Sequence, residues 1–149
     1  MAKEVSFPKD KIKILLLEGL HQSAFNEFHK KGYTSIVSSK DAMTEEELMN
    51  CIEQYHIIGI RSKTTLTAPV LEKAKKLMTI GCFCIGTNQV DLKKATELGI
   101  PVFNSPYSNT RSVAELIIGN SIMLLRRIPE KNKYMHENNW QKTAKGSYE

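Results

Sequence analysis

The sequence has no unbroken apolar run of about 18 residues, the length that a membrane-spanning helix requires. Residues 1–5 also lack the apolar centre of a secretory signal. We therefore expect a protein of the cytoplasm with no membrane partner.

Cysteine is scarce, since the chain contains only Cys51, Cys82 and Cys84. An odd number of cysteines without a secretory signal argues against disulfides. Cys82 and Cys84 form a C-x-C pair inside an apolar run, and no second His or Cys pair completes a zinc-binding pattern. We expect free, buried thiols and no metal site.

A strong excess of one charge is absent as well. The net charge is +5, and the lysines are scattered rather than gathered on one face with aromatic residues. This distribution argues against a nucleic-acid partner. With 25% charged and 41% apolar residues among 149, the chain has the composition of a globular domain and enough length for a core.

Short apolar runs alternate with helical patterns along residues 11–104. The predicted strands cover residues 11–17, 35–39, 56–62, 77–84 and 101–104. The predicted helices between them cover residues 22–31, 44–55, 68–76 and 90–98. Because each strand is apolar throughout and each crossover is long enough for a helix, we predict an α/β fold with a parallel sheet covered on both faces.

Two segments have the S/T-x-x-E spacing of a capping box, in which a hydroxyl and a carboxylate satisfy free amides at the start of a helix. They are Thr44 with Glu47 and Ser112 with Glu115. Thr67 is the predicted cap of the helix that follows it.

The segment from Val113 to Leu125 is apolar on nearly every side of the predicted helix. A helix of this kind is normally buried on several faces, so we expect something to cover it. Pro129 is expected to open a further helix that ends near Asn138. Residues 1–10 and 140–149 are expected to be an irregular arm and an exposed tail.

Polar residues follow several of the predicted strands. These groups are residues 61–64, 85–88 and 104–111, and Lys40 follows the second strand. In parallel sheets, ligands bind beyond the carboxyl ends of the strands. An edge that carries Arg, Lys, Ser and Asn favours a small anion.

Four stretches carry a resemblance to a known group of enzymes. They are residues 18–22, 59–64, 80–91 and 104–115. They resemble the bacterial D-3-phosphoglycerate dehydrogenases, which belong to the NAD-dependent D-isomer-specific 2-hydroxyacid dehydrogenases and open serine biosynthesis. The resemblance implies a flavodoxin-like substrate-binding domain over residues 1–108. It also implies that residues 109–149 are a crossover and dimerisation helix with a tail that leads into a nucleotide-binding domain.

The resemblance implies roles for seven residues. The implied contacts are Arg61, Ser62, Asn109, Lys40 and Lys63 for the substrate's carboxylate and phosphate, and Ile85 and Val113 for the nicotinamide of NAD. The implied substrate is a small phosphorylated 2-hydroxy acid.

The sequence departs from this group in one respect. The eight glycines include no two separated by a single residue, so the G-x-G-x-x-G loop that cradles the pyrophosphate of NAD is absent. The group's catalytic Arg, Glu and His motifs are also absent. We therefore expect a chain that stops before the nucleotide-binding domain, does not bind NAD alone and has no catalytic residue of its own.

Two alternatives remain open. The chain is either that substrate-binding part or a non-catalytic module, including a degenerate remnant, that pairs with itself or with a dehydrogenase subunit through the 112–127 helix. A receiver-like signalling domain shares the sheet topology but needs clustered acidic residues after the first strand, where the sequence has only Glu18.

Overall fold

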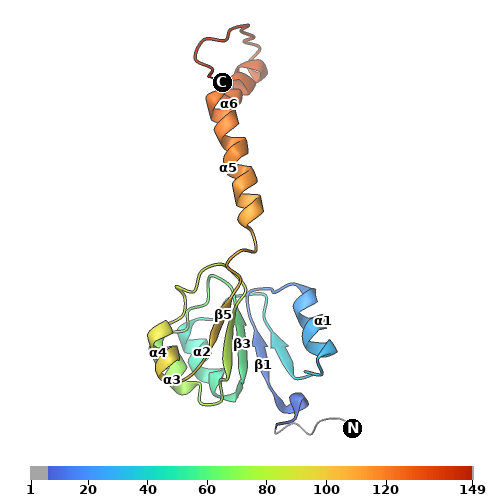
Figure 1. Ribbon diagram of the computed structural model, residues 1–149, viewed down its shortest axis with the longest axis vertical. Helices are drawn as coiled ribbons and strands as arrows, with labels where there is room; N and C mark the ends of the chain where they lie inside the picture. The colour runs from blue at the N-terminus through green and yellow to red at the C-terminus, as the bar shows by residue number, and fades with distance from the viewer. Residues whose placement is uncertain (1–6, 149) are drawn as a thin grey trace. The chain divides into compact units, whose positions relative to one another are not determined.

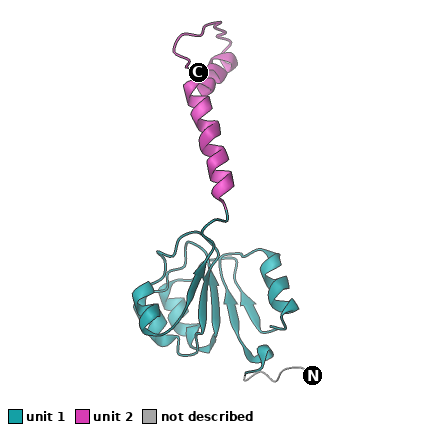
Figure 2. Cartoon of the chain, in the orientation of Figure 1, with its two compact units in different colours: residues 1–108 teal, residues 109–149 magenta. Residues whose placement is uncertain are grey.

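The computed structural model describes residues 7–148 of the chain. The chain divides into two compact units, residues 1–108 and 109–149 (Figure 2). Most of the irregular arm expected over residues 1–10 lies outside the described residues. Its last part forms a short 3-10 turn, η1 (Lys9–Lys11).

The first unit is built on five strands, in chain order β1 (Ile14–Leu16), β2 (Ile36–Ser38), β3 (Ile57–Ile60), β4 (Thr79–Cys82) and β5 (Val102–Asn104). All pairs are parallel, and the order across the sheet is β2-β1-β3-β4-β5 (Figure 1). This is the flavodoxin-like order, so the predicted parallel sheet is confirmed. The strands are shorter than predicted, and apolar residues such as Leu17, Leu77 and Phe83 lie just outside them.

Four helices connect these strands: α1 (Gln22–Lys30), α2 (Glu45–Cys51), α3 (Ala68–Lys73) and α4 (Leu92–Glu97). A 3-10 turn, η2 (Ile52–Gln54), continues α2. Helices α2, α3 and α4 pack on one face of the sheet and α1 packs on the other (Figure 1). The prediction of helices on both faces is therefore confirmed.

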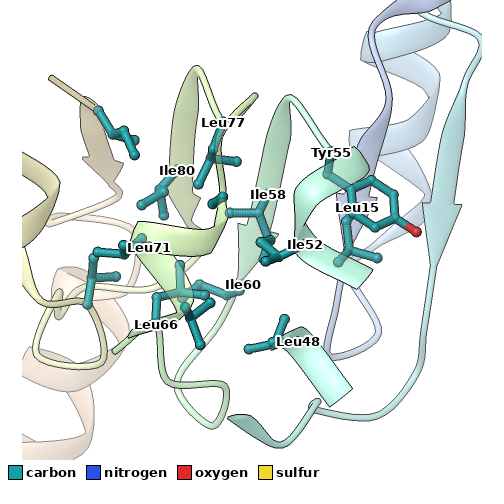
Figure 3. Packing of buried hydrophobic residues seen from close by; sticks show 14 of the residues in the cluster. Leu15, Leu48, Ile52, Tyr55, Ile58, Ile60, Leu66, Leu71, Leu77 and Ile80 are labelled. Atoms are coloured by element: carbon teal, nitrogen blue, oxygen red, sulfur yellow. The ribbon is translucent and has the colours of Figure 1, made fainter. Parts of the chain in front are cut away.

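The larger core lies under α2, α3 and α4 (Figure 3). Leu15, Ile58 and Ile80 point from three strands toward Leu48 of α2 and Leu71 of α3, and each is at most 1% exposed. Burial of one such side chain contributes about 1.5–3 kcal/mol, so this face provides most of the stabilisation of the unit.

The smaller core lies under α1, where Ile14 and Leu16 meet Phe25 and Phe28. Because successive side chains of a strand point to opposite faces, β1 supplies both cores with consecutive apolar residues. This arrangement explains why β1 is an unbroken apolar run.

Helix starts within the first unit are partly as predicted. The Thr44–Glu47 capping box is formed, with the Thr44 hydroxyl accepting from the Glu47 amide and the carboxylate accepting from the Thr44 amide. Thr67 stands at the N-cap of α3, but its hydroxyl donates to Glu45 at 2.7 Å and caps no amide of α3.

The second unit contains α5 (Thr110–Leu125) and α6 (Ile128–His136). The Ser112–Glu115 capping box is wrong: α5 begins earlier, with Asn109 at its N-cap and no side-chain capping bond. The Glu115 carboxylate instead accepts from Nε of Arg111 at 2.7 Å. One helical turn places these two side chains side by side, so an ion pair replaces the cap.

Helix α5 is apolar on nearly every side, yet none of its residues is buried. Six large apolar side chains are at least half exposed: Leu116, Ile117, Ile118, Ile122, Leu124 and Leu125. The expectation of a helix buried on several faces is not met by the part of the chain that the structure describes.

A turn at Arg127 (φ +52°) separates α5 from α6, which ends at His136 rather than near residue 138. The expected tail is exposed over most of its described residues, and its end is held by hydrogen bonds. The Tyr148 amide donates to the Leu125 carbonyl at 2.9 Å, and Nζ of Lys131 donates to the Ser147 hydroxyl at 2.7 Å. These bonds fold the tail back onto the helices of its own unit.

None of the helices described within residues 7–148 is both long and apolar enough to cross a bilayer. Over the same residues, no cluster of three or more His, Cys, Asp or Glu side chains forms a possible metal site. The three thiols are free, with Cys82 buried and the other two partly exposed.

Candidate functional site

The carboxyl edge of the sheet brings together the loops that follow β1, β2, β3 and β4. The chain runs from β1 outward to β2 and then to β3 on the other side of β1, so the direction of winding reverses between β1 and β3. Ligands of open parallel sheets bind at this point of reversal. The loops after β1 and β3 therefore define the candidate site.

The structure brings five of the seven predicted residues to this edge, and four of them are polar. Arg61, Ser62 and Lys63 follow β3 directly, and Lys40 follows β2. All four are exposed, and within residues 7–148 their side chains make no hydrogen bond or ion pair. Three unpaired cations and a hydroxyl thus remain available to an anion.

A buried carboxylate holds the loop after β3. Oε1 of Glu18 accepts from the amides of Arg61 at 3.0 Å and Thr64 at 2.9 Å, and Oε2 accepts from the amide of Lys63 at 3.0 Å. Burial raises the pKa of the Glu18 carboxyl, but these amide donors outweigh it and keep that pKa below its ordinary value of 4.5. Glu18 is therefore ionised at neutral pH.

The backbone at Glu18 holds the loop after β2. Glu18 and the following Gly19 have φ values of +65° and +60°. In this conformation their amides donate to the carbonyls of Asp41 at 3.2 Å and Ser39 at 3.1 Å, the neighbours of Lys40. A positive φ is uncommon for Glu and is found at positions where the surrounding structure enforces it.

A second buried side chain holds Arg61 from the other side. Nε2 of Gln89 donates to the Arg61 carbonyl at 2.7 Å and to the Gly86 carbonyl at 3.2 Å. Sγ of Cys84 donates weakly to the same Arg61 carbonyl at 3.4 Å. The loop after β4, which carries the exposed Ile85, is thereby tied to the loop after β3.

Asn109 and Val113 belong to the second unit. Asn109 is the N-cap residue of α5, and Val113 is 43% exposed in the first turns of that helix. The seven predicted residues therefore fall into two groups: five at the edge of the sheet in the first unit and two at the start of α5.

The sequence analysis missed Glu18 and Gln89. Together with Thr64, they are the buried polar residues among those that the structure describes, and all three lie at this edge. A carboxylate directly after an apolar strand is a signal that would have marked Glu18, because such a group is rarely buried without a partner.

A sequence profile described as "D-isomer specific 2-hydroxyacid dehydrogenase, catalytic domain" matches residues 14–144. The chain belongs to this family. The D-3-phosphoglycerate dehydrogenase of Escherichia coli K12 is 56% identical over all 149 residues, and that of Haemophilus influenzae is 52% identical. The chain spans 36% of the length of each of these relatives. The D-3-phosphoglycerate dehydrogenase 1 of Saccharomyces cerevisiae is 50% identical over 143 residues, 96% of this chain and 30% of that protein.

Solved structures share the fold of this chain. A Pyrococcus horikoshii protein has a TM-score of 0.74 at 30% identity over 90% of this chain and 39% of its own. The Aquifex aeolicus D-lactate dehydrogenase, solved with NAD and lactic acid, has a TM-score of 0.76 at 18% identity over 88% of this chain and 39% of its own. The second likeness supports the fold alone.

The turn after β1 does not fit the pyrophosphate of NAD. Dinucleotide-binding dehydrogenases place the pyrophosphate on glycine-rich amides after the first strand. Here that turn has Glu18 before its single glycine, Gly19, and an ionised carboxylate in place of free amides. The amides of Glu18 and Gly19 already donate to the carbonyls of Asp41 and Ser39, so this turn offers no cradle for a pyrophosphate and no hydride-transfer step is assigned to this chain.

Proposed function

We propose that this chain is the substrate-binding part of a D-3-phosphoglycerate dehydrogenase. The whole enzyme oxidises 3-phosphoglycerate to 3-phosphohydroxypyruvate with NAD in serine biosynthesis. In this proposal the chain binds the phosphorylated 2-hydroxy acid and does not turn it over alone. The carrying observation is the set of unpaired cations at the point where the winding of the sheet reverses.

In this proposal, exposed side chains of the first unit bind the carboxylate and the phosphate of the substrate. The Arg61 guanidinium presents two parallel N–H donors, which match a carboxylate or a phosphate. Ser62 adds a hydroxyl donor, and Lys63 and Lys40 add positive charge. No internal ion pair competes for these groups within residues 7–148, so a ligand does not need to displace one.

We propose that Ile85 in the first unit and, separately, Asn109 and Val113 in the second unit have the contacts that the resemblance implies. The Asn109 side chain forms no capping bond with α5, which leaves its amide group for the substrate. Ile85 of the first unit and Val113 of the second are 44% and 43% exposed, and each, taken by itself, is an apolar side chain that suits the face of a nicotinamide ring held by another part of the enzyme.

Two of the four histidines, His21 and His56, have structural contacts within the first unit. His21 caps α1 by accepting from the Ser23 amide at 3.2 Å. His56 accepts from the Lys13 amide at 3.0 Å at the opposite, amino end of β3. Each of these two imidazoles therefore has a local structural partner, and within residues 7–148 neither is paired with a carboxylate that orients it as a general acid or base.

Isothermal titration with 3-phosphoglycerate and, separately, with NAD tests this proposal. We expect binding of 3-phosphoglycerate and none of NAD. Arg61→Ala is expected to weaken phosphoglycerate binding about tenfold or more, because a charge-assisted bidentate contact is lost. Lys93→Ala removes one exposed charge from α4 and serves as the control.

Equal binding by the Arg61→Ala and Lys93→Ala variants contradicts the assignment of Arg61. Tight NAD binding contradicts the absence of a cofactor site. Reduction of NAD by the chain with phosphoglycerate contradicts the proposal that it is not catalytic.

We propose a second role for α5, as an association surface for another copy of this chain or for a dehydrogenase subunit. Its six exposed aliphatic side chains form an apolar surface of a kind that soluble monomers rarely leave uncovered. The residues concerned lie within the 112–127 segment that the sequence analysis marked.

Sedimentation velocity between about 1 and 100 μM tests this role. We expect concentration-dependent dimers that Ile118→Glu abolishes. Met78→Glu places the same charge at a similarly exposed apolar residue of the first unit and is the control, since Ile118 and Met78 are 62% and 55% exposed. A strictly monomeric wild-type chain at the highest concentration contradicts self-association.

A further inference from the structure

Glu18 makes contacts with every loop that carries a cation of the candidate site in the first unit. Its carboxylate accepts from the amides of Arg61, Lys63 and Thr64. Its own amide donates to the carbonyl of Asp41, next to Lys40. One residue thus connects the loop after β2 to the loop after β3.

We propose that Glu18, assisted by Gln89, is a positioning residue that fixes the backbone of the Arg61–Lys63 loop so that its side chains meet an anionic substrate. This inference rests on the proposed function, because it concerns how the same site is held. Glu18 itself does not touch the substrate.

The backbone of Arg61 is held at both of its polar groups. Its amide donates to Glu18 and its carbonyl accepts from Gln89, while its guanidinium remains unpaired within residues 7–148. Because the backbone is already held and the side chain is free, less conformational entropy is lost when the substrate binds. The carboxylate therefore orders the loop without neutralising its cation.

The same bonds decide which amides a ligand can use. Of four consecutive amides, those of Arg61, Lys63 and Thr64 are occupied by Glu18, and that of Ser62 donates to no acceptor within residues 7–148. A free run of amides would form an anion-binding nest. Here an internal carboxylate fills the nest, and Ser62 is left to offer both its amide and its hydroxyl.

Three variants distinguish the positioning role of Glu18 from an effect of its charge. Glu18→Gln keeps the size of the side chain but turns one acceptor into a donor that faces an amide. Glu18→Asp keeps the charge but withdraws it by one methylene from the amides. Glu27→Gln makes the same charge change on α1, where, among the residues described, the carboxylate pairs with the exposed Lys30 alone.

The experiment is 15N–1H NMR of each folded variant during titration with 3-phosphoglycerate. Without ligand, we expect the amide protons of Arg61, Lys63 and Thr64 to lie downfield in wild type and Glu27→Gln and to shift upfield in both Glu18 variants. On titration, we expect both Glu18 variants to bind about tenfold more weakly and to show a smaller ligand-induced shift at the Ser62 amide.

The outcomes separate this inference from the proposed function. Wild type without phosphoglycerate binding overturns both. If the wild-type chain binds phosphoglycerate and Glu18→Gln binds it with equal affinity, the positioning role alone is overturned. If Glu18→Asp binds with the affinity of the wild type, charge alone acts, and the positioning role is overturned as well. If the Glu18 variants do not fold, Gln89→Met tests the other half of the clamp, and an unchanged affinity in that variant overturns the inference.

Discussion

The two units of the chain use apolar residues in opposite ways. In the first unit, side chains such as Leu15, Ile58 and Ile80 are at most 1% exposed between a sheet and its helices. In the second unit, Ile118 and Leu124 belong to helix α5, which is similar in apolar character to the strands of the first unit, yet they are 62% and 72% exposed. A residue is buried only where a second layer packs against it, so apolar content alone does not decide burial.

The two units also differ in how their helices begin. Thr44 and Glu47 form a reciprocal capping box at α2, whereas Ser112 and Glu115 form none at α5. The sequence spacing is the same in both cases. The difference shows that the capping motif forms its hydrogen bonds only when the first residue of the motif is the N-cap of the helix.

A substitution in the core of the first unit should lower the free energy of unfolding far more than one on α5. Leu15→Ala is expected to lower the free energy of unfolding by about 2–5 kcal/mol, because it leaves a cavity that neighbours on a sheet cannot fill. Ile118→Ala on α5 is expected to change it by less than about 0.5 kcal/mol in dilute solution. Urea denaturation followed by circular dichroism measures both, and equal losses would contradict the contrast between the units.

The next largest effect is expected from the buried carboxylate. Glu18→Gln should lower the free energy of unfolding by about 1–3 kcal/mol, because a buried amide loses its acceptor. The folded-state pKa of Glu18 lies below 4.5, so its contribution is present above pH 4.5 and is lost as the pH falls through the lowered value.

Urea midpoints between pH 3 and pH 7 are the measurement, with these pH values set to span the ordinary carboxyl range. The wild-type chain should lose stability toward the acid end more steeply than Glu18→Gln. Parallel curves for the two proteins would show that Glu18 does not carry the dependence.

The two capping motifs should give a smaller difference in stability between the units. Thr44→Ala should cost about 0.5–2 kcal/mol, since it removes a formed cap. Ser112→Ala should be nearly neutral, because the Ser112 hydroxyl caps no amide. Thermal unfolding of both variants decides, and a similar cost at Ser112 would mean that α5 begins three residues later than described, with Ser112 rather than Asn109 at its N-cap.

The smallest effect is expected at His56, where Lys13 donates its amide to Nδ1. Burial lowers the pKa of His56, and the nearby charges of Lys76 and Lys13 lower it further. Its contribution to stability is therefore complete above the ordinary pKa of 6.5 and declines as the pH falls toward the lowered value.

His56→Gln should remove that decline, whereas His29→Gln, on the exposed side of α1, should leave it in place. Urea midpoints at intervals between pH 5 and pH 8, the range over which histidine titrates, test the difference. An unchanged decline in His56→Gln would assign it to another group.

Much of the fold could be predicted because its causes are local. The apolar runs around Ile14, Ile58 and Ile80 and the helical patterns between them predict a covered parallel sheet, and the sheet is as predicted. The position of Arg61, Ser62 and Lys63 followed from the same argument, since they come directly after an apolar run.

The groups that hold the site could not be predicted in the same way. Glu18 bonds to amides 43, 45 and 46 positions away along the chain, and no local pattern specifies such partners. Gln89 and the Arg61 carbonyl are 28 positions apart. Only the pairing of β1 with β3 and of β3 with β4 brings these groups into hydrogen-bond range.

The sequence by itself determined where strands and helices alternate, which residues follow each strand and that one helix is apolar on nearly every side. These properties depend on periodicity and on neighbours in the chain. The tertiary structure decided that Glu18 fills the amides of the Arg61 loop, that Ser112 caps no helix and that α5 has no cover among the described residues. Those outcomes depend on contacts between distant segments, whose energy is settled only when the layers pack.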